Sequence, residues 1–367
     1  MNSLNKKLYA SINEKFWEIS MRSICLFFIV IIIPIASFSE ELLNVNVNKT
    51  SAKIESFMLV DTISSNSRAV EIEAKSGIIN WQWEIPKKMI NDRSICAGSV
   101  AYPMEDGSVN VLIAKYGLVN VARNKNYKVL LLDDEMDHNA HQYDGKHVVY
   151  ARGFVSKDVP SVILSNINDG KNKNILEWLP SEEFNSKAPF IHKNQQCKSA
   201  KRKAEESNKD WAHVNHVERL ANNNLLISMR NLSLFIEMTE SGEIKYKNNS
   251  VYGVHQPTPY KSGYIAADRN CGQESIHIVS QEGPNKKIFT GEFLTIRGID
   301  HLGSDHFLIT SATSITEISL DGEIHYQAHV IGVSPKAESK VTSPRDLPKI
   351  GYCSPKTLYY ATPLKFG

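Results

Sequence analysis

Residues 70–81 read VEIEAKSGIINW, a strand followed by a tight turn at Gly77 and a second strand. The same twelve-residue pattern returns as FIEMTESGEIKY at 235–246 and as ITEISLDGEIHY at 315–326, each time with glycine at the eighth position. Apolar residues alternate with polar ones on both sides of the glycine, which indicates short antiparallel strands. The chain therefore repeats one hairpin at distant points.

The spacing of these hairpins is close to 40 residues. Gly242 and Gly322 are separated by a fainter copy around Gly283, which gives steps of 41 and 39 residues. Four further steps fit between the first hairpin and Gly242, and the apolar runs at 119–121 and 162–164 fill two of the slots. A fixed period of this length is typical of β-propellers, and the count predicts six units.

A second strand signal opens five of the units. It is a turn followed by an apolar strand: EDGSVNVLIA (105–114), YDGKHVVYA (143–151), ANNNLLIS (221–228), YKSGYIAA (260–267) and GSDHFLIT (303–310). We expect an all-β fold, a six-bladed β-propeller of four-stranded antiparallel blades between Ile54 and Gly332, with the tail after Gly332 packing toward the first blade or over a face. A β-sandwich is the alternative, but it has no reason to repeat a hairpin at a fixed period.

Charge excludes one class of partner. The 42 basic and 40 acidic residues give a net charge of +2, so no nucleic-acid partner is implied. The basic run 198–203 is followed directly by Glu205 and Glu206, which favours a solvated loop over a polyanion site. The surrounding segment, 181–210, has too few apolar residues for a core and is expected to be a polar insertion in the propeller.

The N-terminal region carries an export signal. The apolar segment 23–36 follows Arg22 and precedes the small-residue pattern at 37–39, which is typical of a secretory signal peptide. We expect residues 1–39 to be this signal, with Met21 as a possible true start, and residues 40–367 to be one propeller domain that is periplasmic or secreted. An uncleaved anchor is the alternative. No membrane insertion is expected once the signal is removed.

Four cysteines follow the signal: Cys96, Cys197, Cys271 and Cys353. In an exported protein an even number permits disulfides, and four cysteines allow three pairings. No two of them have the close spacing of a zinc site, so no metal is expected.

Histidines recur at the starts of the units. His138, His216 and His255 each lie ten residues before the second apolar residue of the following strand. The innermost strands of a propeller surround its central channel, so residues at one register of successive blades meet in space. The sequence predicts that these three imidazoles converge. A histidine that only braces a neighbouring blade is the alternative at each position.

The segment 210–233 contains a denser pattern: His213 and Asn215 alternate along one strand, and Ser228 and Arg230 follow the next turn. This His-x-Asn and Ser-x-Arg pair resembles the arylsulfotransferase family of periplasmic six-bladed propellers. The segment 253–270 resembles the family's next motif. The residues that match this motif best are His255, Asp268 and Arg269.

The resemblance implies transfer of a sulfuryl group between phenols, with no cofactor. A neutral imidazole nitrogen attacks the sulfur of an aryl sulfate, and a second phenol accepts the group from the sulfated histidine. Arginines and further histidines hold the sulfuryl oxygens. The expected catalytic residues are His213, His255, Arg230 and Arg269. The chain lacks a Gly-rich phosphate loop, so no nucleotide sulfate is implied as donor.

The pattern departs from the family where the sulfated histidine is expected, in a later blade. Aligning the strands of the fourth and sixth units places Thr295 and Arg297 opposite His213 and Asn215. His301 is the nearest histidine and becomes the candidate nucleophile. The set assigned to substrate binding is His138, Asn215 and Arg297. A non-catalytic exported propeller that binds an anion or a protein is the alternative function, and a quinone-dependent dehydrogenase is disfavoured because Trp-rich blade motifs are missing.

Overall fold

The repeated glycine hairpins form the third and fourth strands of their blades, counted from the centre. They are β3–β4 (Arg68–Glu73 and Ile79–Glu84), β15–β16 (Leu234–Met238 and Ile244–Asn248) and β23–β24 (Ser314–Ser319 and Ile324–Val330). Gly77, Gly242 and Gly322 have φ angles of 72°, 94° and 86°. Side chains are disfavoured in this left-handed region, so each turn requires a residue without Cβ. This requirement is why glycine recurs with the period of the fold.

The computed structural model describes residues 42–63, 66–90, 98–168, 171–184, 210–270, 273–291, 293, 295–331 and 358–364. These residues belong to one compact unit, Glu41–Gly367. The signal segment 1–39, all four cysteines and most of the 181–210 insertion lie outside the described residues, so export and disulfides stay predictions. Of the insertion, the short helix α2 (Pro180–Glu183) is described. None of the described helices is long and apolar enough to cross a bilayer.

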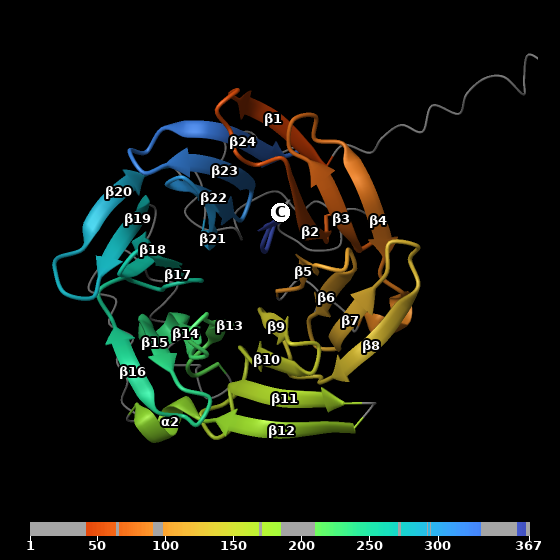
Figure 1. Cartoon of the computed structure of the whole chain (residues 1–367), viewed down its shortest axis with the longest axis vertical. Coiled ribbons are helices and arrows are strands. Elements are labelled where there is room, and N and C mark those ends of the chain that lie inside the picture. Colours follow the sequence, from red (N-terminus) through yellow and green to blue (C-terminus); the bar gives the residue numbers. More distant parts are fainter. Residues whose placement is uncertain are drawn as a thin grey trace, which may run out of the picture. The chain divides into compact units, whose positions relative to one another are not determined.

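The described strands form six antiparallel sheets around a common centre (Figure 1). The middle four are listed from the inner to the outer strand. Blade 2 contains β5 (Val100–Pro103), β6 (Val109–Ile113), β7 (Gly117–Val121) and β8 (Tyr127–Leu132), and blade 3 contains β9 (Ala140–Tyr143), β10 (His147–Ala151), β11 (Val162–Asn168) and β12 (Lys171–Trp178). Blade 4 contains β13 (Val214–Arg219), β14 (Leu225–Met229), β15 and β16, and blade 5 contains β17 (Thr258–Tyr260), β18 (Gly263–Asn270), β19 (Gln273–Ser280) and β20 (Lys286–Thr290). The predicted six-bladed propeller is confirmed.

The first and last blades use both ends of the described chain. In blade 1, β2 (Ser56–Asp61) and the β3–β4 hairpin receive β25 (Thr362–Pro363) as the inner strand. In blade 6, β21 (Ile296–Gly303), β22 (His306–Ser311) and the β23–β24 hairpin receive β1 (Leu43–Asn48) as a fifth, outer strand. The blades thus extend beyond the predicted limits of Ile54 and Gly332. The tail returns to the first blade, as expected.

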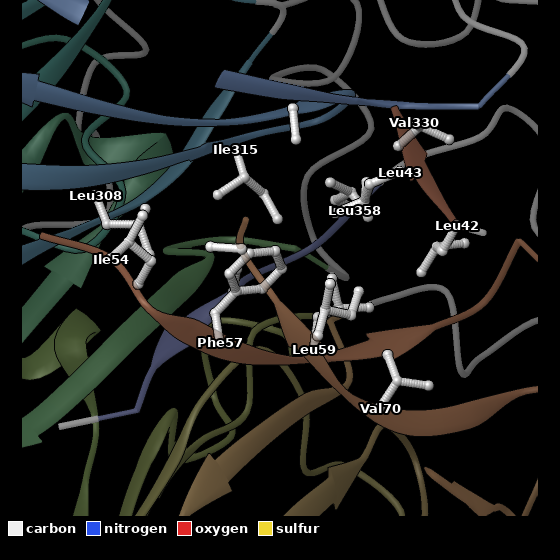
Figure 2. Close-up of a cluster of buried hydrophobic side chains, with 14 of the residues drawn as sticks. Leu42, Leu43, Ile54, Phe57, Leu59, Val70, Leu308, Ile315, Val330 and Leu358 are labelled. Carbon is white, nitrogen blue, oxygen red and sulfur yellow. The ribbon is translucent and has the colours of Figure 1, made fainter. Parts of the chain in front are cut away.

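Apolar clusters fill the spaces between adjacent blades. The cluster between blades 6 and 1 contains Phe57 and Ile315, which are fully buried, and it also includes Leu43 and Leu358 from the two ends (Figure 2). Full burial of one such side chain contributes about 1.5–3 kcal/mol, so the cluster stabilises ring closure substantially. Blade packing of this kind fixes the inner strands around the centre, where the candidate site residues lie.

Candidate functional site

The inner strands of several blades begin after a residue with left-handed backbone. His138, His213 and Thr295 have φ angles of 63°, 51° and 59°, just before β9, β13 and β21. Such angles are uncommon for residues with a side chain, and they concentrate at functional sites where the surrounding structure holds them. Blades 3, 4 and 6 therefore share a constrained turn at the same end of their inner strands.

Two of these turns bring histidines from adjacent blades into contact. His138 and His213 are 3% and 1% exposed, and their Nε2 atoms lie 3.0 Å apart. The Nδ1 atom of His138 donates to Oδ1 of Asp137 at 2.7 Å, and Nδ1 of His213 donates to Oδ1 of Asp210 at 2.6 Å. Both nitrogens of each ring are therefore engaged.

This geometry determines how many protons the histidine pair carries. Carboxylate oxygens only accept hydrogen bonds, so His138 and His213 each hold a hydrogen on Nδ1. Without a further proton, two lone pairs would face each other across 3.0 Å. One proton between the Nε2 atoms turns the contact into a hydrogen bond. A hydrogen bond between the two rings therefore needs a third hydrogen, held between the two Nε2 atoms.

Two cations extend the chain of contacts at its ends. Lys115 Nζ lies 3.2 Å from Oδ2 of Asp137, and an Arg230 guanidinium nitrogen lies 3.5 Å from Oδ2 of Asp210. Burial lowers the pKa of Lys115, but the carboxylates of Asp137 and Glu135 outweigh it, and the net pKa is raised. Lys115 therefore stays charged at neutral pH. Positive groups therefore lie at both ends of this chain.

The close approach of the loop after β10 to the histidine pair depends on Gly153. A Cβ on this residue would lie 2.6 Å from Oδ1 of Asp137, 2.7 Å from Nδ1 of His138 and 2.9 Å from the Val214 carbonyl oxygen. The Gly153 amide donates to the same Asp137 oxygen at 2.6 Å. Only glycine can deliver a backbone donor there.

Aromatic rings border the histidine pair. The Phe154 ring centroid lies 4.9 Å from that of His138 and 4.7 Å from that of His213. Tyr359, from the C-terminal segment, packs edge-on against His138 at 5.2 Å. The Arg297 guanidinium lies 5.5 Å from the centre of the Tyr359 ring, which links blade 6 to the site.

Of the three imidazoles predicted to converge, His138 contacts a different histidine from the two expected partners. The partner of His138 is His213, whereas His216 lies beside Asn139, with their side-chain nitrogens 3.3 Å apart. Blade 4 has a β-bulge between Val214 and His216, and its first turn is longer than that of blade 3, so equal spacing in sequence does not give equal position.

Asn215, the bulged residue, connects blades 4 and 5. Its amide nitrogen donates to the Val254 carbonyl oxygen at 3.1 Å, and its Oδ1 accepts from the Ser228 hydroxyl at 2.6 Å. The predicted substrate-binding residue thus braces the segment that precedes His255.

His255 is buried and has a defined tautomer. Its Nδ1 lies 2.9 Å from the Gly253 carbonyl oxygen, which can only accept, so Nδ1 carries the hydrogen. Nε2 is then the basic nitrogen. The Gly253 amide donates to the Ser233 hydroxyl of blade 4 at 3.1 Å, which fixes the turn.

The remaining predicted catalytic residues have different structural contacts. Asp268 accepts from the Tyr252 amide and braces its own blade. For Arg269 the structure describes the backbone, which pairs with Glu274 in β18–β19. His301 pairs with Phe307 near the far end of β21, and its ring packs on Phe307 and Tyr260. His301 lies six residues after Thr295, which corresponds to about 20 Å along an extended strand.

The C-terminal segment occupies the centre of the ring (Figure 1). Tyr360 packs in the apolar cluster of blades 2 and 3, while its hydroxyl donates to Asp300 of blade 6 at 2.5 Å and accepts from the Gln256 amide. Burial, and then the charge of Asp300, raises the pKa of Tyr360 well above its usual value. Its phenol stays protonated and ties opposite sides of the channel together.

Sequence reasoning missed the groups that surround the histidines, namely Lys115, Asp137, Phe154, Asp210 and Tyr359. The two aspartates were open to discovery, because each lies one or three residues before its histidine. Phe154 and Tyr359 carry no such signal. Among the described residues, no group of three or more His, Cys, Asp or Glu side chains is arranged to hold a metal ion.

Comparison with known proteins identifies one family. A sequence profile described as arylsulfotransferase (ASST) matches residues 44–256. No curated protein sequence matches. Similar solved structures include a protein of unknown function from Bacteroides caccae (12% identity, 74% of this chain and 93% of that chain, TM-score 0.49). Another is virginiamycin B lyase from Staphylococcus aureus (13% identity, 80% of this chain and 90% of that chain, TM-score 0.43). At these scores the structures carry no functional argument.

Proposed function

The chain belongs to the arylsulfotransferase family, and we propose that it moves a sulfuryl group from an aryl sulfate to a phenolic acceptor without a nucleotide. One observation carries this proposal: the buried His138–His213 contact, which Lys115 and Arg230 flank through Asp137 and Asp210. A sulfate ester needs hydrogen-bond donors and cations for its oxygens, since negative charge grows on the leaving phenolate. Arg297 supplies a further cation next to Tyr359.

His255 is the best candidate for the nucleophile. Both ring nitrogens of His138 and of His213 lie in hydrogen-bond contacts with fixed partners. The Gly253 carbonyl oxygen places the hydrogen of His255 on Nδ1, so the neutral imidazole has its lone pair on Nε2. An imidazole must present an unprotonated nitrogen to attack sulfur. Asn215 and Ser233 hold the turn before His255 against blade 4, the blade that also supplies His213.

The proposed reaction has two balanced steps. In the first, Nε2 of His255 bonds to sulfur, the bond between sulfur and the aryl oxygen breaks, and the proton held between the two Nε2 atoms of the pair passes to the leaving phenolate. In the second, the pair takes the proton of the acceptor phenol, the phenol oxygen bonds to sulfur, and the N–S bond breaks. The pair acts as acid and then as base.

The test is transfer from p-nitrophenyl sulfate to phenol with no nucleotide present. We expect release of p-nitrophenol, and a His255-containing peptide heavier by one SO₃ group when phenol is omitted. His255→Ala should abolish both signals. His277→Ala, a change in the same blade, is the matched control and should retain them. No release across several aryl sulfates would contradict the transferase and leave the anion-binding alternative, whereas sulfation of another histidine would reject His255 alone.

We also propose that the protein is exported. This rests on the apolar segment 23–36 and the small residues that follow it. N-terminal sequencing of the purified protein should find a start near Glu40. Intact Met1 on cytoplasmic protein would contradict export.

A further inference from the structure

The aromatic residues beside the histidine pair come from two segments far apart in sequence. Phe154 lies on the loop between β10 and β11, and Tyr359 lies in the segment that follows the six blades. Their rings contact the same imidazole, with centroids 4.9 Å and 5.2 Å from that of His138. Both rings therefore pack against His138.

Phe154 is the exposed member. Its side chain is 36% exposed, although its ring packs against two buried histidines. Most large apolar side chains of the described blades are buried in the clusters between sheets. A partly exposed aromatic ring beside a set of charged groups offers a contact surface for another flat ring.

Each of the two rings has a cation near its face. Lys115 Nζ lies 5.8 Å from the Phe154 centroid, and the Arg297 guanidinium carbon lies 5.5 Å from the Tyr359 centroid. A ligand with an aromatic part next to an anionic part matches this alternation of rings and cations. An aryl sulfate has this composition, as does the phenolate form of its product.

Tyr359 is held in place on both sides. The Leu358 amide donates to the Ala312 carbonyl oxygen at 2.6 Å, and the Ala361 amide donates to the Thr310 hydroxyl at 3.1 Å. Tyr360 is anchored through Asp300. These contacts order the ring before a ligand arrives, so binding does not have to order it.

From these contacts we propose that Phe154 and Tyr359 form the binding surface for the aromatic ring of the substrate, so that the C-terminal segment completes the site. This inference rests on the proposed function and names its specificity: planar phenols and their sulfate esters. Phe154 and Tyr359 act on the ring, while the cations act on the sulfuryl group. The two parts of the ligand should then respond to different substitutions.

The test compares binding of p-nitrophenol with binding of inorganic sulfate by calorimetry. Phe154→Leu and Tyr359→Leu should each weaken p-nitrophenol binding about fivefold or more, the scale of one aromatic contact, and leave sulfate binding within about twofold. Tyr359→Phe keeps the ring and should bind as wild type does. Tyr143→Leu is the matched control, because Tyr143 also lies under an arginine, at 4.3 Å, but at the other end of β9.

Wild-type affinity for p-nitrophenol in both leucine variants would overturn the inference, and so would equal losses of p-nitrophenol and sulfate. If Tyr359→Leu does not fold, Phe154→Leu decides, since its residue is on a loop and partly exposed. Transfer activity is a separate measurement. Selective loss of phenol binding in a protein that releases no p-nitrophenol from its sulfate ester would support the binding surface and reject the proposed reaction.

Discussion

Blades 4 and 6 begin with the same backbone and different side chains. In both, a left-handed residue precedes the inner strand and its carbonyl oxygen accepts a hydrogen bond at 3.1 Å, from Arg230 in one blade and Ala312 in the other. Both strands then bulge at the second residue, Asn215 or Arg297. The two blades thus share the backbone conformation at this turn but differ in the side chains that it carries.

The differences assign opposite roles to equivalent positions. Blade 4 places His213 in the histidine pair and uses Asn215 as a brace to blade 5. Blade 6 has Thr295 at the first position and an arginine over Tyr359 at the second. A propeller can build an asymmetric site in this way, because each blade contributes one turn to a common centre.

The largest expected effect separates His213 from Thr295. His213→Ala removes one half of the histidine pair and should slow sulfuryl transfer about 10²-fold or more, the scale of losing one preorganised donor. Thr295→Ala, at the equivalent backbone position, should change the rate by less than about fivefold. Rates from p-nitrophenol release check both, and equal losses would mean that the shared turn matters rather than the imidazole.

The next effect concerns stability. Asn215→Ala leaves the Val254 carbonyl oxygen and the Ser228 hydroxyl without their buried partner and should lower the free energy of unfolding by about 1–3 kcal/mol. Arg297→Ala, the equivalent change in blade 6, removes a half-buried side chain that lies over Tyr359 and should cost about 0.5–1 kcal/mol, the scale of one cation–π contact. Urea unfolding measures both. A larger loss for Arg297 would reverse the assigned roles.

Binding should show the opposite order. Arg297→Ala removes a cation beside Tyr359 and should weaken inorganic sulfate about tenfold, as expected for one charge-assisted contact. Arg219→Ala is the control, since Arg219 also lies over a tyrosine, Tyr143, and pairs with Glu240 outside the site. Unchanged sulfate affinity in Arg297→Ala would remove this residue from the site.

The last prediction concerns the pH dependence of stability and His141, an inner-strand histidine outside the histidine pair. Burial lowers the pKa of His141, against the raising effect of Glu218. The unfolded chain then binds a proton below about pH 6.5 that the folded chain does not, so stability falls as the pH drops through this range, by at most about 1.4 kcal/mol per pH unit. His141→Gln should flatten the slope between pH 6.5 and 5. An unchanged slope would show that other groups cause it.

Local chemistry explains why the fold was predictable. Gly77, Gly242 and Gly322 occupy turns that need positive φ, so the backbone requirement is written directly into the sequence with the period of the blades. The alignment of Thr295 and Arg297 with His213 and Asn215 was correct for the same reason: both strands bulge identically. The match to His216 failed because one bulge and a longer turn shifted the register of blade 4 against blade 3.

The sequence alone determined the six-bladed repeat and the membership of His213 and Arg230 in one motif, because these depend on neighbours within a few residues. Tertiary structure decided the rest. His138 meets His213 across 75 residues, and Tyr359 reaches His138 only because the C-terminal segment closes the ring inside blade 1. Closure of a ring brings together residues with no local relation, and no period or motif in the chain records which of them will touch.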